Sequence, residues 1–168
     1  MKVKQVNAET QIKETGIDAA IAQLDFERIK HKLMVSDEGE KWTFDQCELA
    51  EREYKRYLTL IKTFPKQQFV PTKLMDKFWH QHILDTVAYH KDCMEVFGHF
   101  IHHFPYFGIY GKEDKANLDA TFNITKELYL KLFNEDIALP HASRCGDDHA
   151  CHVESECACR VSGACKNS

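Results

Sequence analysis

The chain has 168 residues, the length of one ordinary domain, which is long enough to bury a core without disulfide or metal staples. Hydrophobic residues make up 43% of the sequence and charged residues 29%, a balance that excludes a wholly disordered chain. The net charge of −4 disfavours nucleic acid as a partner, because a dedicated binder of phosphate backbones would be basic.

The sequence also disfavours a membrane or secreted location. Lys, Glu, Asp and Gln interrupt the first 24 residues throughout, so we expect no signal peptide. No stretch approaches the roughly 18 apolar residues that a membrane-spanning helix requires. We therefore expect a cytoplasmic protein without a membrane partner. In that compartment, closely spaced cysteines bind metal or perform redox chemistry more often than they form structural disulfides.

Two helical segments are predicted in the first part of the chain. Apolar residues recur at helical spacing over 17–34, which suits one helix or two short ones. Thr43 and Gln46 have the spacing of a capping box, in which each side chain accepts a hydrogen bond from the other's backbone N–H group. The helical period that follows this box continues up to Pro65.

A third, central helix is predicted over residues 73–97. Thr72 is a good N-cap, and Gly98 is a natural residue to follow the last turn. The segment is apolar almost all round, which is typical of a helix buried on most sides. An aromatic, His-rich loop follows over 99–111, and a fourth helix is expected at about 113–133.

These segments predict an all-α fold, a compact bundle of four to five helices. We expect the helical domain to occupy residues 1–139, with its core at about 17–134. Residues 140–168 form an irregular Cys-rich tail, because short residues and cysteines replace the apolar periodicity there. This tail cannot form a hydrophobic core alone.

A polar stripe on the predicted central helix suggests a metal site. At about 100° per residue, His82, Asp85, Tyr89 and Cys93 fall on one face of a regular helix. The i,i+3 spacing of His82 and Asp85 brings an imidazole and a carboxylate together, so that Asp85 either binds the ion or orients the histidine. The alternative is a buried hydrogen-bond network without metal, in which Cys93 packs as a small apolar residue.

The loop after this helix adds further candidate ligands. His99, His102 and His103 follow Gly98, which lets the loop turn back towards the helix. Three or four imidazoles that converge on one carboxylate would suit a zinc, iron or copper ion. His80 points about 160° away from His82 on a regular helix, so as a ligand it would need another site or a local distortion.

The spacing of these residues resembles a known family. The pattern D-x-x-W-H-x-H-x-L, then Y-x-x-D-C, then a Gly and a His, resembles the glycine-rich domain-containing protein-like family over about residues 26–133. The matching positions are Asp76, Trp79, His80, His82, Leu84, Tyr89, Asp92, Cys93, Gly98 and His102 or His103. The chain has only 7 Gly, so it resembles the short bacterial members with a Cys-rich end. The resemblance implies an all-α fold and draws attention to His80, His82 and the Asp92–Cys93 pair, without implying a reaction.

The tail has a regular cysteine spacing, C-x5-C-x5-C-x-C-x5-C. Its cysteines are Cys145, Cys151, Cys157, Cys159 and Cys165. The C-x-C pair suits thiolate capture of soft ions such as Cu(I) or Zn²⁺, and nearby acidic residues favour cation capture. Five thiols also permit two disulfides with one cysteine left over, enzymatic modification, or a tail without fixed structure.

Together these features predict a cytoplasmic metal-binding protein, with a His/carboxylate site in the helical domain and a soft-metal site in the tail. One alternative is a metalloenzyme, oxidative or hydrolytic, that acts on a small molecule or peptide, with Tyr89 or Asp92 as acid or base. Another alternative is a Cys-rich peptide precursor or an interaction module. No phosphate loop, nucleotide fingerprint or Ser-His-Asp order is present.

Overall fold

The computed structural model describes residues 16–35 and 41–137. The described residues form six helices and no strand, which confirms the all-α class. These helices are α2 (Ala19–Ala22), α3 (Glu27–Val35), α4 (Phe44–Thr63), α5 (Lys73–Leu84), α6 (Thr86–Phe97) and α7 (Lys112–Phe133). No helix of the described segments is long and apolar enough to cross a membrane.

Helix α4 begins and ends where its sequence predicts. The Thr43 hydroxyl accepts a hydrogen bond from the backbone N–H of Gln46 at 3.2 Å, and the Gln46 side chain accepts one from the backbone N–H of Thr43 at 2.8 Å. This reciprocal pair satisfies two N–H groups that would otherwise lack partners at the helix start. The helix ends next to Phe64, directly before Pro65.

The predicted helix over 73–97 is not continuous, which corrects the sequence analysis. The chain leaves the helical conformation at Asp85, where φ is −82° and ψ is 72°, and α6 starts in a new direction. The Asp85 carboxylate accepts a hydrogen bond from the backbone N–H of Ala88 at 3.3 Å, which caps α6. The single stripe predicted along this segment therefore does not form. Leu84 lies beside this break and is 54% exposed.

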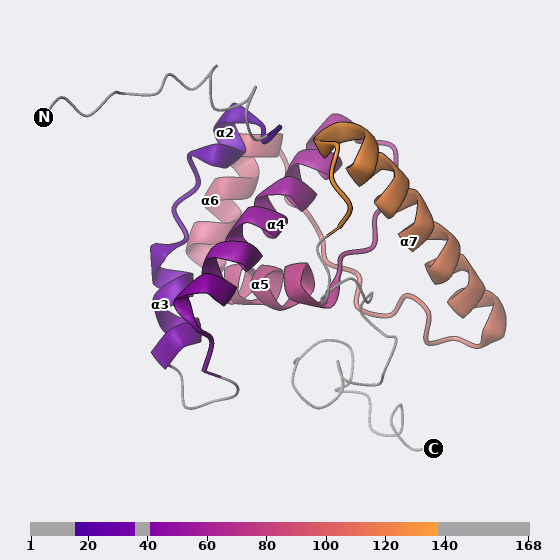
Figure 1. The fold of residues 1–168 in the computed structure, drawn as a ribbon, viewed down its shortest axis with the longest axis horizontal. Helices are drawn as coiled ribbons and strands as arrows, with labels where there is room; N and C mark the ends of the chain where they lie inside the picture. The colour runs from indigo at the N-terminus through magenta and orange to yellow at the C-terminus, as the bar shows by residue number, and fades with distance from the viewer. Residues whose placement is uncertain (1–15, 36–40, 138–168) are drawn as a thin grey trace, which may run out of the picture.

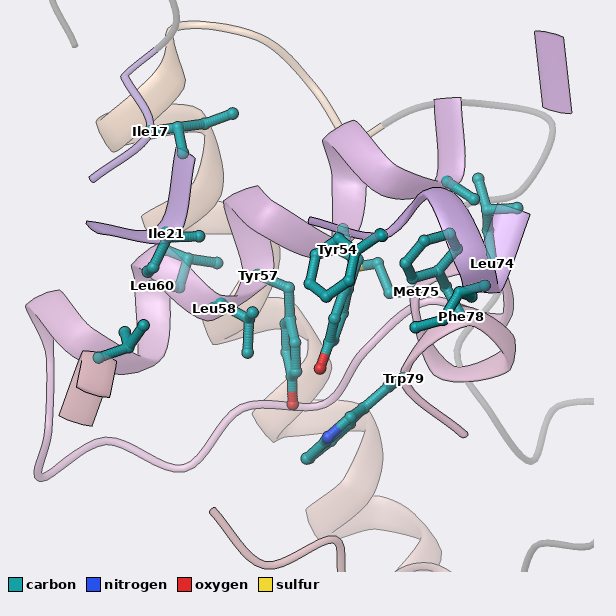
Figure 2. Packing of buried hydrophobic residues seen from close by; sticks show 14 of the residues in the cluster. Ile17, Ile21, Tyr54, Tyr57, Leu58, Leu60, Leu74, Met75, Phe78 and Trp79 are labelled. Carbon is teal, nitrogen blue, oxygen red and sulfur yellow. The ribbon is translucent and has the colours of Figure 1, made fainter. Parts of the chain in front are cut away.

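Helix α4, not the 73–97 segment, is the central element. It contacts α2, α3, α5 and α7 (Figure 1). Its buried face carries Tyr54 and Tyr57, which pack against Phe78 and Trp79 of α5 (Figure 2). The α4–α5 pair is thus held by aromatic rings, and this contact fixes the position of α5, which carries the candidate site.

Candidate metal centre

A compact cluster of one carboxylate and two imidazoles lies between α5 and the loop after α6. Asp76 and His80 are four residues apart on α5, which places them one above the other on the same helix face. Gly98 ends α6 with a φ of +75°, and the following loop carries His103 to this face. Asp76 is buried, whereas the His80 and His103 side chains keep 16% and 13% of their surface exposed.

The candidate ligand atoms of the cluster lie close together. His103 Nε2 lies 2.8 Å from Asp76 Oδ1 and 3.2 Å from His80 Nε2, and His80 Nε2 lies 3.5 Å from Asp76 Oδ2. Two ligands bound at about 2.0–2.1 Å to one ion, at about 90–110° to each other, lie about 2.9–3.4 Å apart. The 3.2 Å between the two imidazole nitrogens lies in this range, and the two distances to the Asp76 oxygens lie within about 0.1 Å of its ends. One ligand atom from each of the three residues lies within 4.8 Å of the other two.

The loop that carries His103 is anchored from both helices. The Tyr89 hydroxyl of α6 donates a hydrogen bond to the backbone carbonyl of Ile101 and accepts one from Trp79 Nε1 at 2.9 Å. Burial raises the pKa of Tyr89, so the hydroxyl keeps its proton at neutral pH. The Trp79 ring lies edge to face with the ring of His103, with the ring centres 4.6 Å apart. These contacts hold His103 in place before any ion binds.

A pocket of about 240 Å³ borders the cluster on the side of Asp76 and His103. Its wall comes from α4, the α4–α5 connection, the loop after α6 and the start of α7. The apolar residues of this wall include Tyr57, Phe69, Val70, Trp79, Phe107 and Leu118. The cluster is therefore reached from a partly enclosed apolar space.

His82 lies outside this cluster, in a buried hydrogen-bond network. The Tyr54 hydroxyl lies 3.0 Å from His82 Nδ1, and Asp92 Oδ2 lies 3.1 Å from His82 Nε2. Because the Asp92 carboxylate only accepts hydrogen bonds, Nε2 of the neutral His82 ring carries the hydrogen and donates to Asp92, and Nδ1 accepts from the Tyr54 hydroxyl. Burial lowers the pKa of His82, although Asp92 opposes this effect. Both ring nitrogens are occupied, as in the metal-free alternative.

The structure disperses the other predicted ligands. Asp85 caps α6, His99 is exposed and contacts the carbonyl of Phe97, and His102 is exposed at the rim of the pocket. Of the predicted histidines, only His80 and His103 come together in the described residues. The tail cysteines Cys145, Cys151, Cys157, Cys159 and Cys165 lie outside the described residues.

Sequence reasoning missed Asp76 as a candidate ligand. Its signal was available, because Asp76 and His80 have the i,i+4 spacing that aligns two side chains on a helix. The predicted catalytic candidates have other roles in the structure. Tyr89 anchors the loop, and Asp92 accepts from His82.

Comparison with known proteins corrects the family. No curated protein and no solved structure matches the chain. A family model described as UCP032817-like matches residues 18–138, which include α2 to α7 and every residue of the cluster. This match overturns the resemblance to the glycine-rich domain-containing family. The chain belongs to the UCP032817-like family.

Proposed function

We propose that this protein binds a divalent transition-metal ion through Asp76, His80 and His103. The observation that carries the proposal is that one ligand atom from each of these residues lies within 4.8 Å of the other two. His103 Nε2 lies 2.8 Å from Asp76 Oδ1 and 3.2 Å from His80 Nε2. Two imidazoles and one carboxylate suit zinc, iron or copper, which accept mixed nitrogen and oxygen ligands.

Hydrogen bonds alone account for this arrangement less well than an ion does. A ring nitrogen of a neutral histidine offers either one hydrogen or one lone pair. His103 Nε2 approaches both the Asp76 carboxylate and His80 Nε2, so it cannot form two full hydrogen bonds with them. A cation between the three residues would instead accept one lone pair from each of them.

Three protein ligands leave a position open for water or another ligand, as in catalytic rather than structural zinc sites. The pocket beside Asp76 and His103 gives such a ligand access. This observation favours a metalloenzyme, oxidative or hydrolytic, as the second candidate function. An ion in this position would act as a Lewis acid or lower the pKa of a bound water.

The soft-metal site in the Cys-rich tail stays a separate prediction. The C-x-C pair of Cys157 and Cys159 carries it. Replacing both residues by Ser should lower the stoichiometry of bound Cu(I) and leave Co²⁺ binding at the helical site unchanged. Native mass spectrometry of the full chain measures both stoichiometries. A parent chain that binds no Cu(I) beyond the helical site would contradict this prediction.

Tryptophan fluorescence can test the helical site without interference from the tail. The chain has two tryptophans, and Trp42→Phe leaves Trp79, whose ring packs against His103, as the only one. In this background, paramagnetic Co²⁺ should quench Trp79 fluorescence with a stoichiometry of one. His80→Ala should weaken this binding by more than about 100-fold, because losing a ligand costs more than losing a residue that only orients one. The matched control is His90→Ala, which removes an exposed imidazole of α6.

Circular dichroism should show intact helices in both histidine variants. Equal Co²⁺ affinities for His80→Ala and His90→Ala would place the ion elsewhere and refute the site. If Co²⁺ causes no saturable quenching in the parent, the three residues form a hydrogen-bonded cluster that binds no ion, and the proposal is refuted.

A further inference from the structure

The pocket beside the cluster has the size of a small organic ligand. Its volume is about 240 Å³. An engineered apolar cavity of about 150 Å³ is large enough to bind benzene. The pocket therefore has room for one aromatic ring with a short substituent, and it is too small for a folded partner or a long chain.

The wall of the pocket favours an apolar body. Tyr57, Trp79 and Phe107 supply aromatic surface, and Val70 and Leu118 supply aliphatic surface. The lining also carries the polar side chains of Gln67, Gln68, Asp76, His102 and His103, which can fix the orientation of a ligand whose body contacts the apolar residues. The binding energy of the ligand's body would come from burying it against these side chains.

The charges at the pocket select the head group. No Lys or Arg is among the described residues that line it, and Asp76 is the only carboxylate there. A divalent ion held by one carboxylate and two neutral imidazoles leaves a charge of +1. One monoanion neutralises this charge, whereas a dianion would leave a negative charge without a basic side chain to balance it. The head group should therefore be a monoanion at neutral pH. A carboxylic acid meets this condition because it is ionised, whereas an ordinary thiol, with a pKa of about 8.5, is mostly protonated.

We infer that the pocket binds a small molecule of about one aromatic ring that carries a single carboxylate, whose oxygen fills the open position of the ion. This inference rests on the proposed function, because the ion is the group that recognises the carboxylate. The Asp76–His103 side of the cluster faces the pocket, so the head group reaches the ion while the ring contacts Trp79 and Phe107.

Phenylacetate is the probe for this inference, and isothermal titration calorimetry of the full chain is the measurement. With Co²⁺ bound, phenylacetate should bind with one site, and binding should be at least about tenfold weaker without Co²⁺. Acetate lacks the ring and benzylamine carries the opposite charge, so both should bind at least about tenfold more weakly than phenylacetate, which corresponds to about 1.4 kcal/mol.

Variants of the loop test the aromatic contact. Phe107→Ala should weaken phenylacetate binding about tenfold and leave Co²⁺ affinity unchanged, because Phe107 lines the pocket but is not one of the three candidate ligands. Phe104 also lines the pocket, so Phe104→Ala should weaken phenylacetate binding as well. Because this side chain is 62% exposed, its removal should leave the fold intact. Tyr110→Ala is the matched control, since Tyr110 is an exposed aromatic residue of the same loop that does not line the pocket.

The outcomes separate the two proposals. A parent chain that binds no Co²⁺ overturns the proposed function and this inference with it. A chain that binds Co²⁺ but not phenylacetate overturns this inference alone. Binding of phenylacetate that is independent of Co²⁺, or that is matched by acetate or benzylamine, also overturns it.

Discussion

Tyr89→Phe should weaken both the fold and the metal site, because one hydroxyl bonds the buried Trp79 and the partly buried Ile101. Its removal leaves Trp79 Nε1 and the carbonyl of Ile101 without this hydrogen bond. An unsatisfied buried polar group costs about 1–3 kcal/mol. We expect the free energy of unfolding to fall by about this amount, which lowers Tm by about 4 °C per kcal/mol in a domain of this size. The loop also loses its anchor, so Co²⁺ affinity should fall about 10–100-fold.

Tyr129→Phe is the control for this experiment. The Tyr129 hydroxyl is equally buried and also serves two partners, since it donates to Glu53 at 2.7 Å and accepts from Arg56 at 2.8 Å. None of these three residues contributes to the metal cluster. Thermal unfolding and Co²⁺ titration of both variants should therefore show two unstable proteins, of which only Tyr89→Phe loses metal affinity. Equal Co²⁺ affinities in the two variants would refute the role of Tyr89 in holding the loop.

Two further predictions concern stability, measured by urea unfolding. Gly98→Ala should lower the free energy of unfolding by about 1–2 kcal/mol, through its φ of +75° alone. Gly108→Ala should cost about 1–3 kcal/mol more, because its Cβ would lie 2.6 Å from a side-chain carbon of α7. Equal losses of stability in the two variants would contradict this difference. Burial would raise the pKa of Glu51, but hydrogen bonds from Lys30 and Lys55 hold it below its ordinary value. These ion pairs therefore stabilise the fold above about pH 4.3 and are lost as pH falls through the lowered pKa. Glu51→Gln should reduce stability by about 1 kcal/mol at pH 7 and by less at pH 3, and an equal loss at both pH values would refute this.

Local signals in the sequence predicted most of the helices. The capping box of Thr43 and Gln46, the N-cap Thr72 and the terminal Gly98 all act through hydrogen bonds or dihedral angles within a few residues. Such effects depend on neighbours in the sequence, so they can be read without knowledge of the fold. The break at Asp85 is also local, but the i,i+3 spacing from His82 predicts that Asp85 binds an ion or orients the histidine, and does not predict a cap.

The site was less predictable, because it depends on which side of α5, that of His80 or that of His82, faces the loop after α6. His80 and His82 lie on opposite sides of α5, and the sequence alone does not say which side packs against α4. The ring of His82 packs on Tyr54 of α4, and its nitrogens are satisfied there. That contact turns His80 and Asp76 towards the loop, where His103 arrives.

The break at Asp85 produces both networks around the site. In one continuous helix, residues ten positions apart would be separated by about 15 Å along the axis. Yet Asp92 lies 3.1 Å from His82, and the Tyr89 hydroxyl lies 2.9 Å from Trp79 Nε1, although both pairs are ten residues apart. The fold-back of α6 on α5 is therefore what satisfies His82 and what gives Tyr89 its hold on the His103 loop. A straight helix could satisfy the pattern of a polar stripe, but it could not assemble the three ligands.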